Sequence, residues 1–203
     1  TARIAAARPA VSSRGTAWRN AIPFRAQSVI AISGQEDRET SIQSMKQSIA
    51  NGNPNGIWSY GWMQVGFAGS LNLYTNAVNT ATGPNWRGDL AGDGTPAIWK
   101  NTSGSTQYGV PNGMISLHPG PGTQPSVLRW TAPLGGDVRV QGQFLAGDGG
   151  TMQVAVRVAG QTWWTASNAG AFDLQTNVAA GTTIDFAVYG GYGAGNTPLS
   201  ARI

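Results

Sequence analysis

Few residues in this chain are able to do acid–base, nucleophilic or metal chemistry. The 203 residues include one histidine, no cysteine and nine acidic residues, which excludes disulfides, thiolate sites and metal sites built from several histidines. A Ser-His-Asp triad has to use His118, which is followed by Pro119 and Gly120, and no Gly-x-Ser-x-Gly elbow occurs. We therefore expect His118 to hold a turn through a hydrogen bond between its ring and the backbone.

The acidic residues form no catalytic or cation-binding pattern. From residue 53 onward the chain has no glutamate and no Asp-x-Asp-x-Asp run of the kind that binds calcium. We expect Asp173 and Asp185 at outward strand positions. Three other aspartates lie in or beside glycine-rich turns, where aspartate commonly bonds to local backbone: Asp93, Asp137 and Asp148. We therefore expect that the protein is not an enzyme and uses no metal and no cofactor.

Aromatic side chains are the remaining candidates for ligand binding, because the flat faces of Trp and Tyr stack on the apolar side of a sugar ring. Trp163 and Trp164 are neighbours in an expected strand, so one of them points outward. Tyr189 and Tyr192 flank a Gly-Gly pair, in a loop that can present rings to a ligand. Core or inter-subunit packing is favoured over ligand stacking for four other tryptophans: Trp58, Trp86, Trp99 and Trp130.

Short strands must position these side chains. Alternating or apolar runs, separated by Gly, Pro, Asn and Asp clusters, predict an all-β sandwich or barrel, and no strand alternates with a long helix. One run places Trp58, Tyr60 and Trp62 on a single strand face, as either a binding platform or a core slab. The expected strands lie within residues 57–65, 127–133, 137–145, 152–158, 183–189 and 199–203.

One pentapeptide, Leu-Ala-Gly-Asp-Gly, occurs twice, at residues 90–94 and 145–149. The residues on either side of the two copies do not match. We therefore interpret the string as an Asp-Gly turn used twice, and not as the unit of a repeat architecture.

The positive charge is concentrated at the N-terminus, where residues 1–35 carry five arginines and no acid. Proline and serine interrupt this segment too often for a long helix. Three interpretations are open: a solvated tail, an extended arm that clasps a neighbouring subunit, and a nucleic-acid contact. We favour the clasp, because arginines alternate with apolar residues. The expected arm residues are Arg3, Arg8, Arg14, Trp18, Arg19, Phe24 and Arg25.

A short amphipathic helix is expected between this arm and the strands. Ser33 and Glu36 have the spacing of a capping box, and apolar residues follow at helical spacing up to Asn51-Gly52. The sequence therefore predicts three parts: an arm over 1–34, a helix and linker over 35–52, and a β-sandwich over 53–203.

Three motifs in residues 53–203 resemble one known family. They are Asn-Pro-Asn-Gly-Ile-Trp-Ser-Tyr-Gly at 53–61, Leu-His-Pro-Gly at 117–120 with Val-Leu-Arg-Trp-Thr-Ala-Pro at 127–133, and Ala-Gly-Thr-Thr-Ile-Asp-Phe-Ala-Val at 180–188. They resemble the carbohydrate-binding-module-like jelly-roll domain of bacterial exported and surface proteins. The resemblance implies a jelly roll that is generally non-catalytic. Members often carry an Asp before the last strand, and residues 195–199 have none.

Two functions from different classes are weighed. We favour a structural surface subunit, a bacteriophage capsid decoration protein at the virion surface, whose basic arm clasps copies of itself or the capsid protein in a homo-oligomer. The alternative is a carbohydrate-binding or adhesive module at the cell surface or outside the cell, which binds glycans through Trp163, Trp164, Tyr189 or Tyr192. Neither nucleic acid nor a membrane is expected as a partner.

Overall fold

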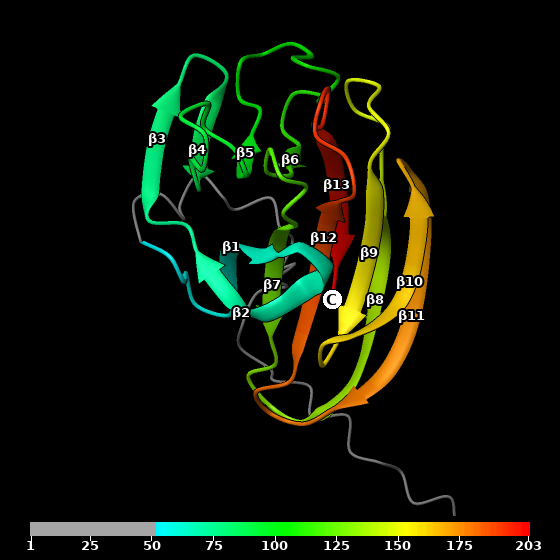
Figure 1. Ribbon diagram of the computed structural model, residues 1–203. Helices are drawn as coiled ribbons and strands as arrows, with labels where there is room; N and C mark the ends of the chain where they lie inside the picture. Colours follow the sequence, from blue (N-terminus) through cyan, green and yellow to red (C-terminus); the bar gives the residue numbers. More distant parts are fainter. Residues whose placement is uncertain (1–51) are drawn as a thin grey trace, which may run out of the picture. The chain divides into compact units, whose positions relative to one another are not determined.

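The computed structural model describes residues 52–203, which form two antiparallel β-sheets (Figure 1). The expected arm over 1–34 and nearly all of the helix and linker over 35–52 lie outside the described residues. The six-stranded sheet has the order β10 (Gln161–Ser167), β9 (Gln153–Val158), β12 (Thr183–Tyr189), β7 (Ser126–Thr131), β1 (Trp58–Gln64) and β2 (Ala68–Leu73).

The second sheet has seven strands, and its two halves come from distant parts of the chain. Its order is β11 (Gly170–Val178), β8 (Gly136–Phe144), β13 (Thr197–Arg202), β6 (Ile115–His118), β5 (Ala97–Lys100), β4 (Gly83–Arg87) and β3 (Asn76–Thr80). A short 3₁₀ turn, η2 (Val65–Phe67), joins β1 to β2. The architecture confirms the predicted jelly-roll β-sandwich.

The main core lies between the two sheets, as strand alternation requires. Ile184, Phe186 and Val188 of β12 are fully buried there, as the sequence predicts. Trp58 and Tyr60 also belong to this core, and the ring of Tyr60 stacks on Trp86 with a centroid distance of 6.4 Å. Residues 57–65 therefore contribute to a core slab and not to a binding platform.

The outer face of the six-stranded sheet carries a second, smaller core. Met63, Val127 and Ala187 are buried there, and Phe67 and Leu71 from the β1–β2 hairpin pack against them. Asp185 points to this outer side, as the sequence predicts, but it is buried there, with 1% exposed. The β1–β2 hairpin covers this part of the sheet. The alternation of residues within β12 does not predict this cover.

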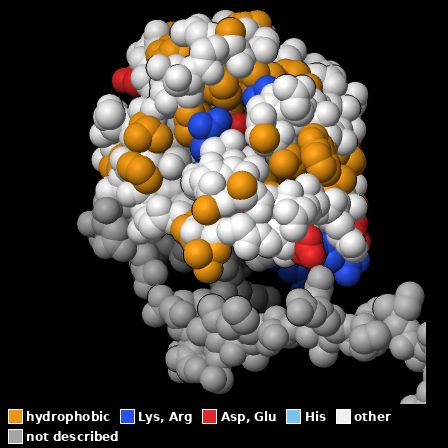
Figure 2. All heavy atoms as spheres, turned by 90° about the horizontal axis from the view of Figure 1, so that it is seen from below, with side chains coloured by type: hydrophobic (Ala, Val, Ile, Leu, Met, Phe, Trp, Pro, Cys, Tyr) orange, Lys and Arg blue, Asp and Glu red, His pale blue; other side chains and the backbone are white. Residues whose placement is uncertain are grey.

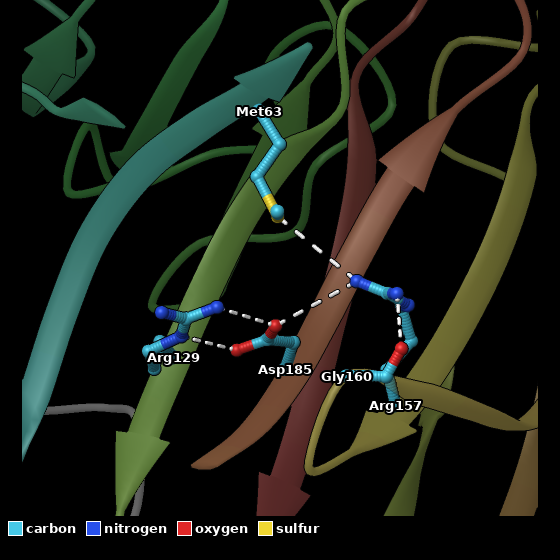
Figure 3. Close-up of polar contacts among 5 residues, drawn as sticks. All are labelled: Met63, Arg129, Arg157, Gly160 and Asp185. Atoms are coloured by element: carbon cyan, nitrogen blue, oxygen red, sulfur yellow. Dashed lines mark hydrogen bonds and ion pairs between the residues drawn. The ribbon is translucent and has the colours of Figure 1, made fainter. Parts of the chain in front are cut away.

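Asp185 forms an ion pair with arginines on both neighbouring strands (Figure 3). Arg129 donates to its two carboxylate oxygens at 2.6 and 2.8 Å, which raises the pKa of Arg129. Arg157 lies 4.0 Å from the carboxylate and covers the ring of Phe67 at 4.0 Å, and it also donates to the backbone oxygen of Gly160. Burial lowers the pKa of Arg157, and the charge of Asp185 opposes that shift.

Asp173 occupies the outward strand position that the sequence predicts, and 48% of its side chain is exposed. Hydrogen bonds from Arg139 and Gln141 lower its pKa from 3.8 to about 2. The folded state therefore binds the proton less tightly than the unfolded state does, and the pair stabilises the fold above pH 3.8. We expect this contribution to fade as the pH falls toward 2, and a carboxyl NMR titration of wild type and Arg139→Gln measures it. An Asp173 pKa that is unchanged in Arg139→Gln contradicts this assignment.

Candidate functional site

A cleft of about 430 Å³ opens on the outer face of the seven-stranded sheet, over β4, β5 and β6. Alternation along these strands builds it: the residues at one set of positions enter the core, as Ile98 does, and their neighbours face the cleft. Register then aligns Asn85 with Trp99 on neighbouring strands, and His118 with Ala97. The cleft is therefore floored by a row of polar and aromatic side chains held on rigid strands.

Two aromatic residues form one wall of the cleft. Trp99 is a lining residue that is 5% exposed, and Tyr108 meets it edge-on with a centroid distance of 6.3 Å and an interplanar angle of 79°. Tyr108 is 64% exposed and has a φ of 49°, a left-handed conformation that is uncommon for a residue with a side chain. The segment therefore holds a largely exposed ring at the cleft in an uncommon backbone conformation.

The turn that carries Tyr108 is held by close packing. Gly109 has a φ of 69°, and a Cβ atom there would overlap the backbone of Gly147. Backbone hydrogen bonds between Gln107 and Val110 close the turn. The aromatic ring is therefore presented by a constrained segment.

The two copies of the repeated pentapeptide flank the same loop, between β12 and β13. Asp93 of the first copy accepts a hydrogen bond from the Tyr192 hydroxyl, and Asp148 of the second accepts one from the Asn196 side chain at 3.0 Å. The oxygen of the Asn196 side chain accepts in turn from the indole N–H of Trp99 at 2.8 Å. The repeated turn therefore positions the loop that borders the cleft.

Asp93 and His118, two titratable residues of the cleft, have defined local partners. Thr95 donates its backbone N–H and its hydroxyl to Asp93, both at 2.9 Å, and the backbone bond lowers the pKa of Asp93. The ring Nδ1 of His118 lies 2.8 Å from the backbone oxygen of Pro119, which confirms its predicted role in a turn. The same ring meets Tyr192 edge-on at 5.5 Å.

Two residues that line the cleft carry a buried polar atom without a hydrogen-bond partner among the described residues. Within residues 52–203 there are six such side-chain atoms, and two of them belong to the lining residues Asn85 and Arg87. A third is the hydroxyl of Ser116, whose residue pairs with Trp99, and a fourth is Oδ1 of Asp148, which holds Asn196. Buried polar atoms are nearly always partnered, so Asn85 and Arg87 are two lining residues whose hydrogen-bonding capacity the described residues leave unused.

The four aromatic residues singled out from the sequence lie in different surroundings. Tyr192 is at the cleft, in contact with His118 and Asp93. Tyr189 packs against Phe67 at 4.9 Å, and Trp164 stacks on Phe144 at 6.1 Å toward the core. Trp163 is 47% exposed on β10 and does not line the cleft.

The sequence predicts packing for Trp99 and does not single out Tyr108. Trp99 is 5% exposed and packs against Asn196 and Tyr108 at the cleft. Tyr108 follows a Gly-, Ser- and Thr-rich segment, residues 102–107, which is the one signal of exposure that the sequence contains. The positions of Trp99 and Tyr108 depend on loops that are distant in the sequence, because Gly109 packs on Gly147 and Trp99 donates to Asn196.

Exposed apolar side chains elsewhere on the described surface are scattered. Figure 2 shows hydrophobic side chains in several separate groups among other side chains and backbone, and basic side chains beside a hollow, on the side seen from below. Scattered apolar groups of this kind are ordinary on protein surfaces. The large exposed hydrophobic residues are Val65, Leu73, Leu90, Tyr108, Leu134 and Trp163.

The described part of the chain has neither a metal-binding group of side chains nor a helix that could span a membrane. Residues 52–203 contain no group of three or more His, Cys, Asp or Glu side chains placed to hold a metal ion. No helix in this range is long and apolar enough to cross a membrane. The predicted arm residues, from Arg3 to Arg25, lie outside the described residues, so the clasp stays a prediction.

Comparison with known proteins finds partial likenesses to carbohydrate-binding modules. No protein-family model and no curated protein matches the chain. A family 35 carbohydrate binding module from an environmental isolate is 17% identical with a TM-score of 0.29, over 39% of this chain and 64% of that one. The family 35 module from Clostridium thermocellum is 13% identical with a TM-score of 0.30, over 43% and 75%. An isomalto-dextranase from Arthrobacter globiformis T6, complexed with panose, is 15% identical with a TM-score of 0.31, over 52% and 20%.

Proposed function

We propose that this protein is a non-catalytic glycan-binding module and that the cleft over β4, β5 and β6 is its binding site. The observation that carries the proposal is the wall formed by Trp99 and Tyr108 beside the unpartnered polar atoms of Asn85 and Arg87. Sugars present an apolar ring face and a ring of hydroxyls, so a site for them needs both kinds of group within one concave surface.

The polar groups of the cleft suit hydroxyl recognition. Asn85 and Arg87 line the cleft with an amide and a guanidinium group, and Asp93 offers carboxylate oxygens at the rim. Rigid strands carry Asn85 and Arg87, so little ordering is required when a ligand binds. A volume of about 430 Å³ lies in the range of small-molecule sites.

Binding without catalysis is the simpler chemistry for these residues. Asp93 is held charged by Thr95, so it is not arranged as a proton donor to a leaving group. We place the protein at a cell surface or outside the cell, where glycans are abundant. The capsid-decoration hypothesis depends on residues 1–34, and nothing in residues 52–203 favours it.

A glycan array with matched aromatic variants tests the proposal. We expect the full chain to bind a defined set of glycans, and Tyr108→Ala to weaken that binding about tenfold, because a stacked ring contributes about 1 kcal/mol or more. Trp163→Ala is the control, since Trp163 is also exposed but does not line the cleft. It should bind like wild type, and both variants should keep the wild-type melting temperature. Wild type that binds no glycan, or equal loss in both variants, contradicts the proposal.

A further inference from the structure

Asn101 is a fully buried polar residue that lies between the two aromatic residues of the cleft wall in the sequence. It directly follows β5, which carries Trp99, and precedes the turn that carries Tyr108. Its exposed fraction is 0%, and it does not line the cleft. Asn101 also begins an Asn-Thr-Ser sequence, the acceptor pattern for N-glycosylation. A glycan is bulky and lies at the surface, so the buried position of Asn101 does not suit that modification.

The side-chain amide of Asn101 makes every hydrogen bond that an amide can make. Its nitrogen donates to the backbone oxygens of Ser105 and Val110, both at 2.7 Å. Its oxygen accepts the backbone N–H of Ser103 at 3.0 Å and the Ser103 hydroxyl at 2.8 Å. An amide has two N–H donors and two acceptor positions, so residues of one loop satisfy all four.

These hydrogen bonds lie on both sides of Tyr108 in the sequence. The amide nitrogen of Asn101 holds the chain at Ser105, before Tyr108, and at Val110, after it. The backbone of Asn101 also fixes the end of the loop, because its N–H donates to Met114 at 2.9 Å and its carbonyl accepts from Gly113 at 2.7 Å. One buried residue at the end of β5 therefore fixes the whole segment that carries the Tyr108 ring.

We propose that Asn101 is a positioning residue of the cleft, whose amide holds the Tyr108 ring edge-on to Trp99 and thereby sets the affinity for a glycan. The inference rests on the proposed glycan-binding function. Asn101 itself does not line the cleft, so it acts through the ring that it positions. A ring that is already held in place loses little freedom when a ligand binds, and a loosened ring binds more weakly.

Asn101→Asp tests this role with a side chain of the same size. The substitution removes both N–H donors and places a carboxylate oxygen against the backbone oxygens of Ser105 and Val110. We expect the loop to separate from β5 and Tyr108 to leave its position beside Trp99. Ser103→Ala is a milder variant, because it removes one hydroxyl donor and leaves the bonds of the amide nitrogen intact.

Asn53 provides a matched control with the same chemistry elsewhere in the fold. Its amide nitrogen donates to the backbone oxygens of Tyr60 and Tyr74 at 2.6 and 2.9 Å, and its oxygen accepts the Tyr60 N–H at 3.0 Å. None of these three residues lines the cleft. Asn53→Asp should therefore lower the melting temperature while it leaves the glycan Kd of the folded protein unchanged.

A double-mutant cycle measures whether Asn101 acts through Tyr108. Calorimetry on the full chain, with the tightest-binding array glycan and below every melting temperature, gives Kd for wild type, Asn101→Asp, Tyr108→Ala and the double variant. We expect each single substitution to weaken binding about tenfold, and the double variant to bind within about threefold of Tyr108→Ala. If Asn101→Asp does not fold, the cycle uses Ser103→Ala, with an expected loss of about twofold that disappears in the Tyr108→Ala background.

Independent effects in this cycle overturn the inference. They would appear as a loss of about a hundredfold in the double variant, the product of the two single losses. A loss of binding in Asn53→Asp equal to that in Asn101→Asp also overturns it, because general destabilisation then explains both.

Hydrogen–deuterium exchange without any ligand separates this inference from the proposed function. Backbone amides of residues 102–113 should exchange at least about tenfold faster in Asn101→Asp than in wild type, and at the wild-type rate in Asn53→Asp. Unchanged exchange in Asn101→Asp overturns the inference and leaves glycan binding intact. Wild type that binds no glycan overturns the proposed function, and with it the effect of Asn101 on affinity.

Discussion

Replacing Asp185 by asparagine is expected to lower the free energy of unfolding by about 3 kcal/mol. The carboxylate is 1% exposed and faces Arg129 and Arg157, whose side chains are 22% and 10% exposed. Removing its charge leaves two mostly buried guanidinium groups beside each other without an anion. The value lies at the lower end for a broken buried ion pair, because Arg129 keeps part of its side chain in solvent.

A matched variant separates burial from ion pairing in this prediction. Arg139 and Asp173 form a two-pronged pair of the same kind, at 2.8 and 2.6 Å, but both side chains are about half exposed. Asp173→Asn should therefore lower the urea midpoint at neutral pH much less than Asp185→Asn does. If Asp173→Asn and Asp185→Asn lower the free energy of unfolding equally, the burial of Asp185 does not control how much its ion pairs stabilise the fold.

Gly147→Ala is expected to destabilise the protein by about 2–5 kcal/mol and to abolish glycan binding. Gly147 has a φ of 63°, and a Cβ atom would overlap the carbonyl oxygen of Asn196 and lie 3.0 Å from Pro198. The loop between β12 and β13 must then move away from the second Leu-Ala-Gly-Asp-Gly turn. That movement breaks the bonds from Asp148 through Asn196 to Trp99, which position the aromatic wall.

The first copy of the pentapeptide provides the control. Gly92 has the same position in the repeat and a φ of 77°, but a Cβ atom there has no neighbour within 4 Å. Gly92→Ala should cost only the backbone strain of about 1–2 kcal/mol and should keep glycan binding. Chemical denaturation and calorimetry measure both quantities. If Gly92→Ala matches Gly147→Ala, the contact with the β12–β13 loop is not what constrains the second turn.

Strand alternation makes much of the fold predictable from the sequence. Ile184, Phe186 and Val188 occupy alternate positions along one strand, so they must share one face. Glycine-rich breaks separate the short strands, and the two patterns together predict a sandwich. The local role of His118 in a turn was predictable for the same reason, since its partner is the adjacent Pro119. These are properties of neighbouring residues along one chain segment.

Local residue patterns therefore predict the strand-rich class, the turns and the shortage of catalytic groups. Which side chains meet depends on how distant segments pack: Asp185 is buried under the β1–β2 hairpin, and Arg87, Trp99 and Tyr108 converge with a loop almost one hundred residues away. Alternation assigns a side chain to one of two faces, but whether that face is covered, and by what, depends on packing between segments distant in the sequence. For this reason the sequence motifs do not predict the cleft, which depends on the tertiary structure.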